Sequence, residues 1–355
     1  MNERKPWKGN EAVASAAILA GCDFYAGYPI PPQNEVMEIL ASKLPQSGGV
    51  FIQAESELGA INIVKGASCA GAHPMTATSA PGLALMQEGI ASMTTGRVPC
   101  VIVDMQRAVD FVNPAQLDYN TATKAVGHSG LRVLVYTAST IQGMMETTML
   151  AFRKAEQYRT PVYLLFDGML GQMIEQARLP DTVPELPDKS DWIIGNCAGR
   201  LKRAIVDSPA MKLKGNAGFD ANEKKLRELD ELFKTWEDTE VLFEEYRMED
   251  AEYAVVSYGS SARVARDAVD ELRSNGVKAG LFEAISLFPF PRKQLAALPE
   301  RGIKGVVTAE MAVTPQFFHD VNETLSGRIP VEAYTRGGAN TVVSSEITQR
   351  IMSFM

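Results

Sequence analysis

The sequence predicts an α/β protein with two doubly wound, mainly parallel β-sheets. Three observations predict this class. Short apolar runs alternate with longer helical runs over residues 1–178, a proline-rich stretch interrupts the alternation at residues 180–187, and a second alternation begins near residue 254. Strands that alternate with helices along a chain form parallel sheets covered by helices on both faces. We therefore expect one domain at residues 1–178, a connector at 179–250 and a second domain at 251–355.

Two periodicities predict the elements of the first domain. Apolar residues three or four positions apart predict helices, and short apolar runs predict strands that are buried on both faces. The predicted helices cover residues 12–20, 35–44, 58–70, 83–93 and 141–158. The predicted strands cover residues 22–28, 50–52, 75–78, 100–103, 133–136 and 162–166.

The connector is predicted from composition. The prolines at residues 180–187 exclude a helix interior or a central strand there, and residues 188–221 fit no clear pattern. Residues 222–246 are highly charged, with an apolar stripe that predicts one long helix with a single packed face: Leu226, Leu229, Leu232 and Phe233. The second domain is then predicted to have strands over 254–258, 278–282 and 305–309, and helices over 262–274, 316–325 and 347–354.

Composition and charge exclude several classes of function. The formal net charge is −8 and no basic stripe occurs, which argues against nucleic acid as the main partner. No run approaches the roughly 18 apolar residues that a membrane span needs, and no apolar signal core follows residues 1–5. The 4 cysteines are far apart and form no Cys-x-x-Cys, so we expect neither zinc nor an iron–sulfur cluster within this chain. These features predict a reduced, cytoplasmic protein.

Two segments combine a strand end with a helix start, where open α/β sheets place their ligands. Residues 27–35 contain three prolines, which would also suit a rigid turn that starts a helix near Gln33 or Asn34. Residues 53–61 contain Glu55 and Glu57 at a helix start. The helix dipole alone would stabilise either carboxylate. Alternatively, the small residues after Glu57 would let this helix approach a partner, so that the carboxylate meets a ligand shared across an interface.

The sequence resembles the α subunits of 2-oxoacid:ferredoxin oxidoreductases, which carry the pyrimidine-binding domain for thiamine diphosphate. The family's Gly-Tyr-Pro-Ile-Thr-Pro motif corresponds to Gly27-Tyr28-Pro29-Ile30-Pro31-Pro32. The Gln-Asn-Glu at residues 33–35 resembles the branched-chain, 2-oxoisovalerate branch more than the 2-oxoglutarate branch. Further matches span nearly the whole chain, at residues 50–53, 55–57, 75–79, 81–82, 87–89, 158–162, 168–173, 258–263 and 287–291. The resemblance implies a pyrimidine-binding domain followed by a transketolase C-terminal-like domain.

The same resemblance implies the residues that contact the cofactor. Glu57 matches the glutamate that hydrogen-bonds N1′ of the aminopyrimidine, and Tyr28, Pro29 and Ile30 belong to the cofactor-binding motif. A carboxylate at N1′ favours the imino tautomer of the ring, which can take the proton from thiazolium C2. Glu55 is then left with a structural role.

The resemblance places Mg²⁺ and the Fe₄S₄ clusters on partner subunits. The family's diphosphate motif is Gly-Asp-Gly followed by Asn, whose hard oxygen ligands suit Mg²⁺. Phe166-Asp167-Gly168 followed by Asn196 imitates this spacing. The first glycine is missing, however, and the proline-rich stretch intervenes, so we expect no metal site in this chain.

Two departures from the family concern the substrate. The family's substrate-contacting threonine is Pro31 here, which has no donor, and the family's Arg-Gly-Gly-Pro loop becomes a shorter loop from Arg107 with Asp110 and Phe111. Arg107 matches the arginine that pairs with the 2-oxoacid carboxylate, a task suited to a guanidinium fork, and a structural ion pair with Asp110 is the alternative. His128, flanked by Gly127 and Gly130, matches a family histidine and is expected either at the substrate or in a structural role.

The resemblance predicts one subunit of an enzyme that decarboxylates a 2-oxoacid, best 2-oxoisovalerate, to an acyl-CoA and passes the electrons to ferredoxin. Coenzyme A is the co-substrate. A β subunit would bind the diphosphate and Mg²⁺, and γ and ferredoxin-like δ subunits would complete the complex. Pro31 and the altered loop leave two alternatives, a bulkier or aromatic 2-oxoacid and a catalytically silent assembly subunit. A non-redox thiamine decarboxylase half-subunit is a third.

Overall fold

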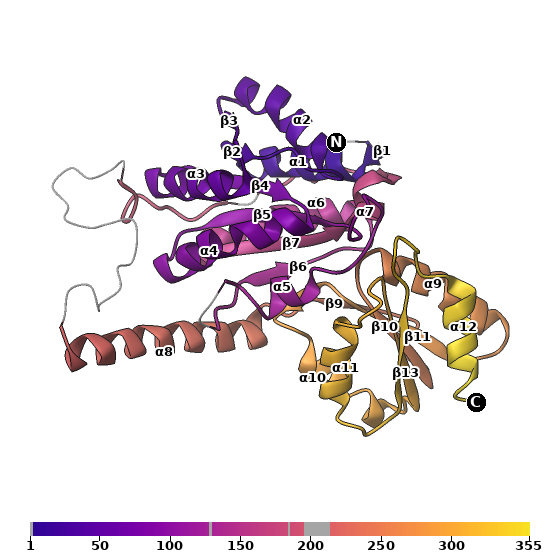
Figure 1. The fold of residues 1–355 in the computed structure, drawn as a ribbon. Coiled ribbons are helices and arrows are strands. Elements are labelled where there is room, and N and C mark those ends of the chain that lie inside the picture. The colour runs from indigo at the N-terminus through magenta and orange to yellow at the C-terminus, as the bar shows by residue number, and fades with distance from the viewer. Residues whose placement is uncertain (1–2, 128–129, 184, 195–213) are drawn as a thin grey trace.

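The structure, a computed structural model, describes residues 3–127, 130–183, 185–194 and 214–355 (Figure 1). The first half of the chain is built on a seven-stranded sheet of order β12-β6-β7-β5-β4-β2-β3. Its strands are β2 (Phe24–Gly27), β3 (Val50–Gln53), β4 (Pro74–Thr78), β5 (Cys100–Gln106), β6 (Leu134–Tyr136), β7 (Pro161–Asp167) and β12 (Ser286–Phe288). All neighbours pair in parallel except β12 and β6, and β4, β5 and β7 are buried along their whole length. Central parallel strands of this kind are apolar throughout because helices cover both faces.

Helices of the first half form two groups. α1 packs against α2 and α6, whereas α3 packs against α4. The helices are α1 (Gly9–Leu19), α2 (Asn34–Lys43), α3 (Glu57–Ala70), α4 (Ala80–Gly96), α5 (Tyr119–Thr123), α6 (Ile141–Tyr158) and α7 (Gly168–Gln172), with a 3-10 turn η1 (Pro45–Ser47). A separate antiparallel pair joins β1 (Lys5–Lys8) to β8 (Ile174–Ala177).

The second half is a smaller α/β unit with a five-stranded sheet of order β14-β13-β10-β11-β9. Its strands are β9 (Phe243–Tyr246), β10 (Tyr253–Ser257), β11 (Ala279–Ala284), β13 (Gly305–Glu310) and β14 (Val331–Thr335). Only the edge strand β9 is antiparallel to its neighbour. The helices are α9 (Gly259–Ser274), α10 (Arg292–Ala296), α11 (Phe317–Leu325) and α12 (Ser344–Met352), with a 3-10 turn η4 (Pro299–Arg301). The predicted α/β class with mainly parallel sheets is confirmed.

One predicted element is wrong in part. The charged stretch forms the long helix α8 (Asn216–Thr239), which runs beneath the first half in Figure 1, but the predicted helix does not continue to residue 246. Phe243–Tyr246 is β9 instead, paired with β11. The ring of Phe243 stacks on Phe282 of β11 with centroids 5.0 Å apart. This long-range pairing overrides the local helical pattern.

A buried glutamine joins the two halves beside the loop that follows β5. The Gln116 side chain donates to the carbonyl of Tyr258 at 2.9 Å and accepts from Ser261 Oγ at 2.7 Å and from the Met311 backbone N–H at 2.9 Å. Its own backbone N–H donates to the Met311 carbonyl at 2.9 Å. The second half therefore fixes the far end of the loop that begins at Arg107.

Within the described ranges, no helix combines the length and the apolar character needed to cross a membrane.

Candidate functional site

The predicted site residues follow three strands of one group of four neighbours. β3, β2, β4 and β5 are adjacent and parallel in the first sheet, so their carboxyl ends lie at one edge. Tyr28 follows β2, Glu57 follows β3, and Arg107 follows β5. The carboxyl edge of an open α/β sheet is where such proteins bind ligands. The topology thus brings the predicted residues to the same edge, although they are far apart in the sequence.

Glu57 is the first residue of α3 and is only 6% exposed. Ser56 caps the helix, with its hydroxyl accepting from the Gly59 N–H at 3.0 Å. Glu57 therefore belongs to the first turn of α3, at the positive end of the helix dipole. The neighbouring Glu55 is exposed; its Oε1 accepts from the hydroxyl of Ser56 at 3.3 Å, and its carboxylate lies beside Gly59.

The Glu57 carboxylate lies against the first turn of α4. A Cβ atom on Gly82 would lie 2.6 Å from Glu57 Oε1 and 2.0 Å from Thr78 Oγ1, so only glycine fits there. No hydrogen bond or ion pair to the Glu57 carboxylate occurs within the described part of the chain. A largely buried residue whose carboxylate has no protein partner is a candidate for binding a ligand that supplies a donor.

Gly82→Ala tests the close approach of α3 and α4. The added methyl group collides with the stiff, buried Thr78 and with Glu57, so we expect the free energy of unfolding to fall by about 1–3 kcal/mol. The matched control is Gly66→Ala in α3, where a Cβ meets no atom within 4 Å and helix propensity improves. Equal stability of the two variants in thermal or urea unfolding would contradict the contact.

The proline segment after β2 is a tight, anchored turn. The Pro31–Pro32 peptide bond is cis, and the Pro32 carbonyl accepts from Asn10 Nδ2 at 2.8 Å and from Gln172 Nε2 at 2.9 Å. Tyr28, Pro29 and Pro31 are exposed, whereas Ile30 is buried. α2 begins at Asn34 with Gln33 as its N-cap, but neither side chain caps the helix; Gln33 Nε2 bonds back to the Tyr28 carbonyl at 3.3 Å. The expected rigid turn is present.

This turn meets the base of the loop that follows β5. A Cβ on Gly168 would lie 3.2 Å from Pro32 Cγ, 3.5 Å from the Gln106 carbonyl oxygen and 3.7 Å from Pro114 Cα. These three segments therefore converge around one glycine, and the Pro31 turn and Arg107 lie on neighbouring parts of the site.

Arg107 begins a short loop with an apolar tip. Arg107 and Pro114 form an isolated antiparallel bridge, and the Ala108 N–H donates to the Asn113 carbonyl at 2.9 Å. The tip exposes three large apolar side chains, Val109 (71%), Phe111 (57%) and Val112 (54%). No ion pair of Arg107, with Asp110 or any other carboxylate, occurs between described residues. The guanidinium is thus available for an anionic ligand, and the structure gives no support to the alternative pairing with Asp110.

Asp167, which the sequence also singles out, is engaged elsewhere in the fold. Asp167 is buried; its Oδ1 accepts from the Met169 and Leu170 N–H groups, and its Oδ2 accepts from the Ser260 N–H at 3.0 Å. These bonds start α7 and hold the second half of the chain, so Asp167 has a structural role. His128 and Asn196 lie outside the described residues.

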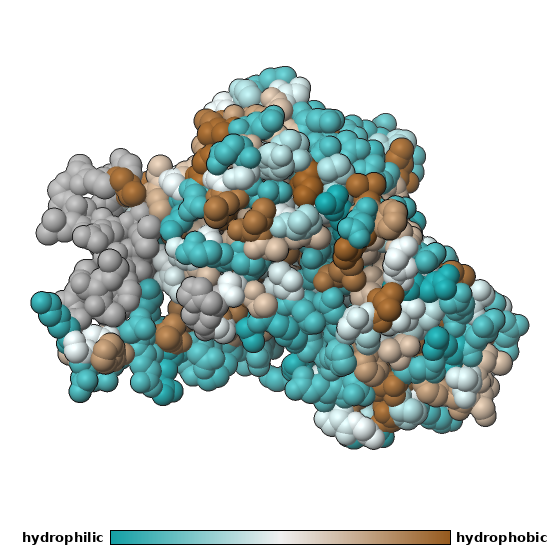
Figure 2. Space-filling view, in the orientation of Figure 1, coloured by the Kyte–Doolittle hydropathy of each residue, from teal (hydrophilic) through white to brown (hydrophobic). Residues whose placement is uncertain are grey.

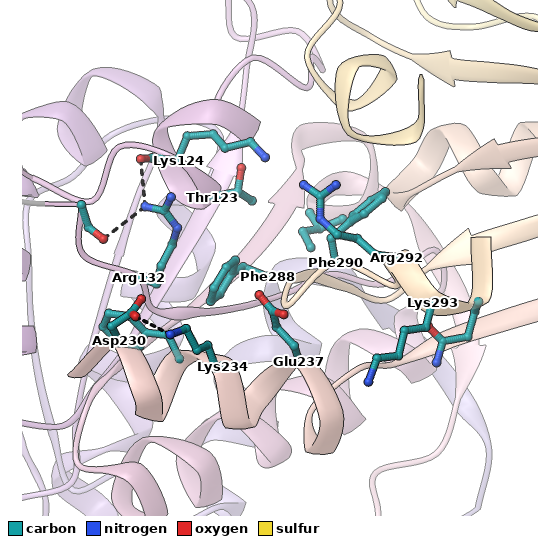
Figure 3. A pocket seen from close by; sticks show the side chains of 14 residues that line it. Thr123, Lys124, Arg132, Asp230, Lys234, Glu237, Phe288, Phe290, Arg292 and Lys293 are labelled. Carbon is teal, nitrogen blue, oxygen red and sulfur yellow. Dashed lines mark hydrogen bonds and ion pairs between the residues drawn. The ribbon is translucent and has the colours of Figure 1, made fainter. Parts of the chain in front are cut away.

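A separate pocket of about 330 Å³ lies between α5, α8 and α10 (Figure 3). Phe288 and Phe290 line it together with several charged side chains. Those charges are largely matched: Lys124 bonds to Asp320 at 2.5 and 2.7 Å, Arg292 pairs with the same carboxylate at 3.2 Å, and Lys234 pairs with Asp230 at 2.8 Å. The pocket contains none of the predicted site residues, and we interpret it as part of the packing between the two halves.

Sequence reasoning missed a buried acidic pair, Asp104 and Asp118, at the two ends of the segment that contains Arg107. No motif identifies these residues. Each has only a weak local pattern: Asp104 is a charged residue inside an otherwise apolar strand, and Asp118 is a charged residue just before a helix.

Comparisons with known proteins identify the family and the fold of this chain. A family model described as pyruvate flavodoxin/ferredoxin oxidoreductase, thiamine diphosphate-binding, matches residues 15–194, and one for core domain II of pyruvate:ferredoxin oxidoreductase matches residues 251–347. The ketoisovalerate oxidoreductase subunit VorB of Methanothermobacter marburgensis is 39% identical over 347 residues, covering 97% of this chain and 96% of that protein.

Two solved structures are similar in fold. The 2-oxoglutarate:ferredoxin oxidoreductase of Magnetococcus marinus, with 2-oxoglutarate, coenzyme A and succinyl-CoA bound, has a TM-score of 0.86 and 26% identity; the match covers 99% of this chain and 65% of that chain. An inactive split-gene transketolase tetramer has a TM-score of 0.57 at 15% identity, over 98% of this chain and 97% of that chain, and this likeness concerns the fold alone.

Proposed function

Because the chain belongs to the 2-oxoacid:ferredoxin oxidoreductase family, as the subunit with the thiamine diphosphate-binding domain, we propose that its site at Glu57 holds the aminopyrimidine of that cofactor. The observation that carries this proposal is the buried Glu57 carboxylate, which lies over Gly82 and has no partner among the described residues. A ring nitrogen that shares a proton would satisfy it. When bound, thiamine diphosphate supplies the carbon nucleophile that attacks the carbonyl of a 2-oxoacid.

The residues of this chain have separate tasks in the proposal. Glu57 holds a proton at N1′ of the ring, and the turn of Tyr28, Pro29 and Ile30 forms one wall of the cofactor site. Arg107 binds the carboxylate of the 2-oxoacid through its guanidinium fork. Pro31 has no donor to share that carboxylate, so Arg107 carries more of the binding than an arginine with a neighbouring threonine would. His128 remains a predicted substrate-binding residue.

The substrate we propose is a branched-chain 2-oxoacid, 2-oxoisovalerate. The relative VorB, by its name, acts on ketoisovalerate, and the loop tip after Arg107 presents Val109, Phe111 and Val112 rather than a second cation. An apolar tip suits an apolar side chain and offers nothing to a second carboxylate. An aromatic 2-oxoacid is the alternative substrate, because the apolar loop tip also suits an aromatic ring. The specificity test is kcat/KM of the complex for 2-oxoisovalerate, phenylglyoxylate, pyruvate and 2-oxoglutarate, in which 2-oxoisovalerate should have the highest value.

Partner subunits belong to the same proposal. Two large apolar side chains are exposed near the site: Leu58, beside Glu57, is 50% exposed, and Leu85 of α4 is 56% exposed. Figure 2 shows apolar side chains among polar ones over the region of α3 and α4. A β subunit covering this surface would bring the diphosphate site, Mg²⁺ and an Fe₄S₄ cluster, with γ and δ subunits completing the complex in the cytoplasm. The domain boundaries at residues 178 and 251 are part of this proposal.

The chain purified alone is expected to be colourless and inactive toward every 2-oxoacid. The three described cysteines (Cys22, Cys69 and Cys100) are buried and separate, and Asp167 is fully engaged in hydrogen bonds. The visible spectrum and the iron content of the isolated chain check this expectation, with the co-expressed complex as the coloured, active control. Iron–sulfur absorbance from the chain alone would contradict it. A complex that contains iron but oxidises no 2-oxoacid would favour the silent assembly subunit, and an iron-free decarboxylase would favour the non-redox alternative.

A further inference from the structure

Gln116 ends the loop that begins at Arg107, and it is fully buried. Its Nε2 donates to the Tyr258 carbonyl at 2.9 Å, and its Oε1 accepts from Ser261 Oγ at 2.7 Å and from the Met311 N–H at 2.9 Å. Its backbone N–H donates in turn to the Met311 carbonyl at 2.9 Å. A buried polar side chain whose bonds are all satisfied in this way rigidifies the segments that it joins.

The first turn of α9 holds both Gln116 and the end of β7. A Cβ atom on Gly259 would lie 2.9 Å from Gln116 Nε2 and 3.0 Å from Asp167 Oδ2, so α9 begins in close contact with both side chains. The Ser260 N–H donates to Asp167 Oδ2 at 3.0 Å, and the Ser261 hydroxyl donates to Gln116. Three consecutive residues of α9 therefore fix two separate segments of the first half.

Asp167 lies beside the start of the same loop. It is paired with Gln106 in the register of β5 and β7, and Gln106 immediately precedes Arg107. A Cβ on the next residue, Gly168, would lie 3.5 Å from the Gln106 carbonyl oxygen and 3.7 Å from Pro114 Cα. Pro114 is the residue that Arg107 meets in its isolated bridge. The start of α9 thus supports the beginning of the loop through Asp167 and its end directly.

The loop tip offers Arg107 little support of its own. Val109, Phe111 and Val112 are all more than half exposed. The Ala108 N–H bonds within the loop, to the Asn113 carbonyl at 2.9 Å. Exposed segments with few buried contacts open more readily than the elements that carry them. The position of the loop therefore depends on how firmly its two ends are held.

We propose that Gln116 is a positioning residue, which together with the first turn of α9 holds the Arg107 loop in the conformation that binds the 2-oxoacid carboxylate. The inference rests on the proposed role of Arg107. It gives the second half of the chain a task in substrate binding, although none of the predicted substrate-binding residues lies there. A loop that is ordered beforehand spares the substrate the cost of ordering it. When the loop is released, the apparent affinity falls by the fraction of molecules that keep the binding conformation.

The experiment measures KM, kcat and cofactor affinity of the assembled complex that carries Gln116→Met. Methionine has a similar length but cannot make the three side-chain bonds. We expect KM for the 2-oxoacid to rise about five- to thirtyfold, because the loop is no longer held in one conformation. We expect kcat and thiamine diphosphate affinity to stay within about twofold, because the lost order weakens binding of the ground state and the transition state alike.

A milder variant and a matched control accompany this test. Ser261→Ala removes one bond to Gln116 and suits the helix, so we expect KM to rise about two- to fivefold. Arg263→Met is the control, because it also breaks a contact between α9 and the first half, the 2.8 Å ion pair with Glu175 of β8, but away from the loop. We expect the control to leave KM unchanged.

A double variant of Gln116→Met with Arg107→Lys separates this inference from the proposed function. If Gln116 acts through Arg107, the rise in KM of the double variant is smaller than the product of the two single effects. Independent effects, an equal rise in Arg263→Met, or an unchanged KM in Gln116→Met would overturn the inference while the proposed role of Arg107 stands. An unchanged KM in Arg107→Lys means instead that the proposed role itself fails. Ser261→Ala decides the matter if Gln116→Met does not assemble.

Discussion

Replacing Glu57 with glutamine is expected to lower kcat of the assembled complex by about 10²–10⁴-fold while leaving folding and assembly intact. The amide has nearly the same shape as the carboxylate, so the contacts of α3 with Gly82 and Thr78 remain. It cannot hold a proton shared with N1′, so the acid–base contribution of the side chain is lost. Steady-state kinetics of the complex with saturating cofactor measure the loss of kcat, and its thermal stability shows whether folding and assembly are intact.

Glu55→Gln is the matched control for Glu57→Gln. Both residues lie at the start of α3, but Glu55 is exposed and Glu57 is buried. A role through the helix dipole alone would give both variants a similar, small effect of about 0.3–1 kcal/mol on stability and none on kcat. Near-normal kcat in Glu57→Gln would show that Glu57 is only a helix-terminus carboxylate.

Arg107→Lys is expected to raise KM for the 2-oxoacid about ten- to a hundredfold and to leave thiamine diphosphate affinity unchanged. Lysine keeps the charge but loses the bidentate fork, and a lost hydrogen bond to a charged group costs about 1.5–3 kcal/mol. The loss should fall on KM because the carboxylate is bound in the ground state and in the transition state alike. Cofactor affinity is measured separately by titration of the apo complex.

Adding Pro31→Thr to Arg107→Lys tests whether a hydroxyl donor at position 31 can replace part of the lost binding of the substrate carboxylate. Restoring the family's hydroxyl donor beside Arg107→Lys should lower KM again in the double variant. Arg178→Lys is the control, since the Arg178 side chain is 40% exposed and pairs with Asp181 near the surface, where such pairs contribute little. A change in stability without a change in KM on Arg107→Lys would mean that Arg107 is structural, and the silent-subunit alternative would then gain support.

The fold was predictable where the pattern is local. The helix at 141–158 matches α6 in both bounds, because its amphipathic repeat is bounded by a Thr140 cap that accepts from the Gly143 N–H at 3.0 Å. Two strands with weak local patterns and distant partners were not predicted. β12, from the second half of the chain, completes the first sheet beside β6, and β9 replaces the end of a predicted helix. The partner of β12 lies in the other half of the chain, and the partner of β9 is β11, which follows only after β10 and α9.

The site residues also divide into those that a local motif identifies and those that only tertiary structure identifies. Glu57 and Arg107 could be named from the sequence because each belongs to a motif that follows a strand, and the structure places both at one sheet edge. The burial of Asp104 and Asp118 could not be predicted, because it depends on tertiary packing. The role of Gln116 in fixing the loop depends likewise on Tyr258, Ser261 and Met311, which only tertiary structure brings near.

The central claim, that Glu57 acts on N1′ of thiamine diphosphate, is tested most directly by the rate at which the C2 hydrogen of the bound cofactor exchanges with deuterium. This rate reports the proton chemistry of the cofactor without any 2-oxoacid, coenzyme A or ferredoxin. We expect exchange about 10²–10⁴-fold slower in the Glu57→Gln complex than in the unmodified complex, with Glu55→Gln unchanged. Equal exchange rates in the Glu57→Gln and unmodified complexes, both loaded with cofactor, would contradict it.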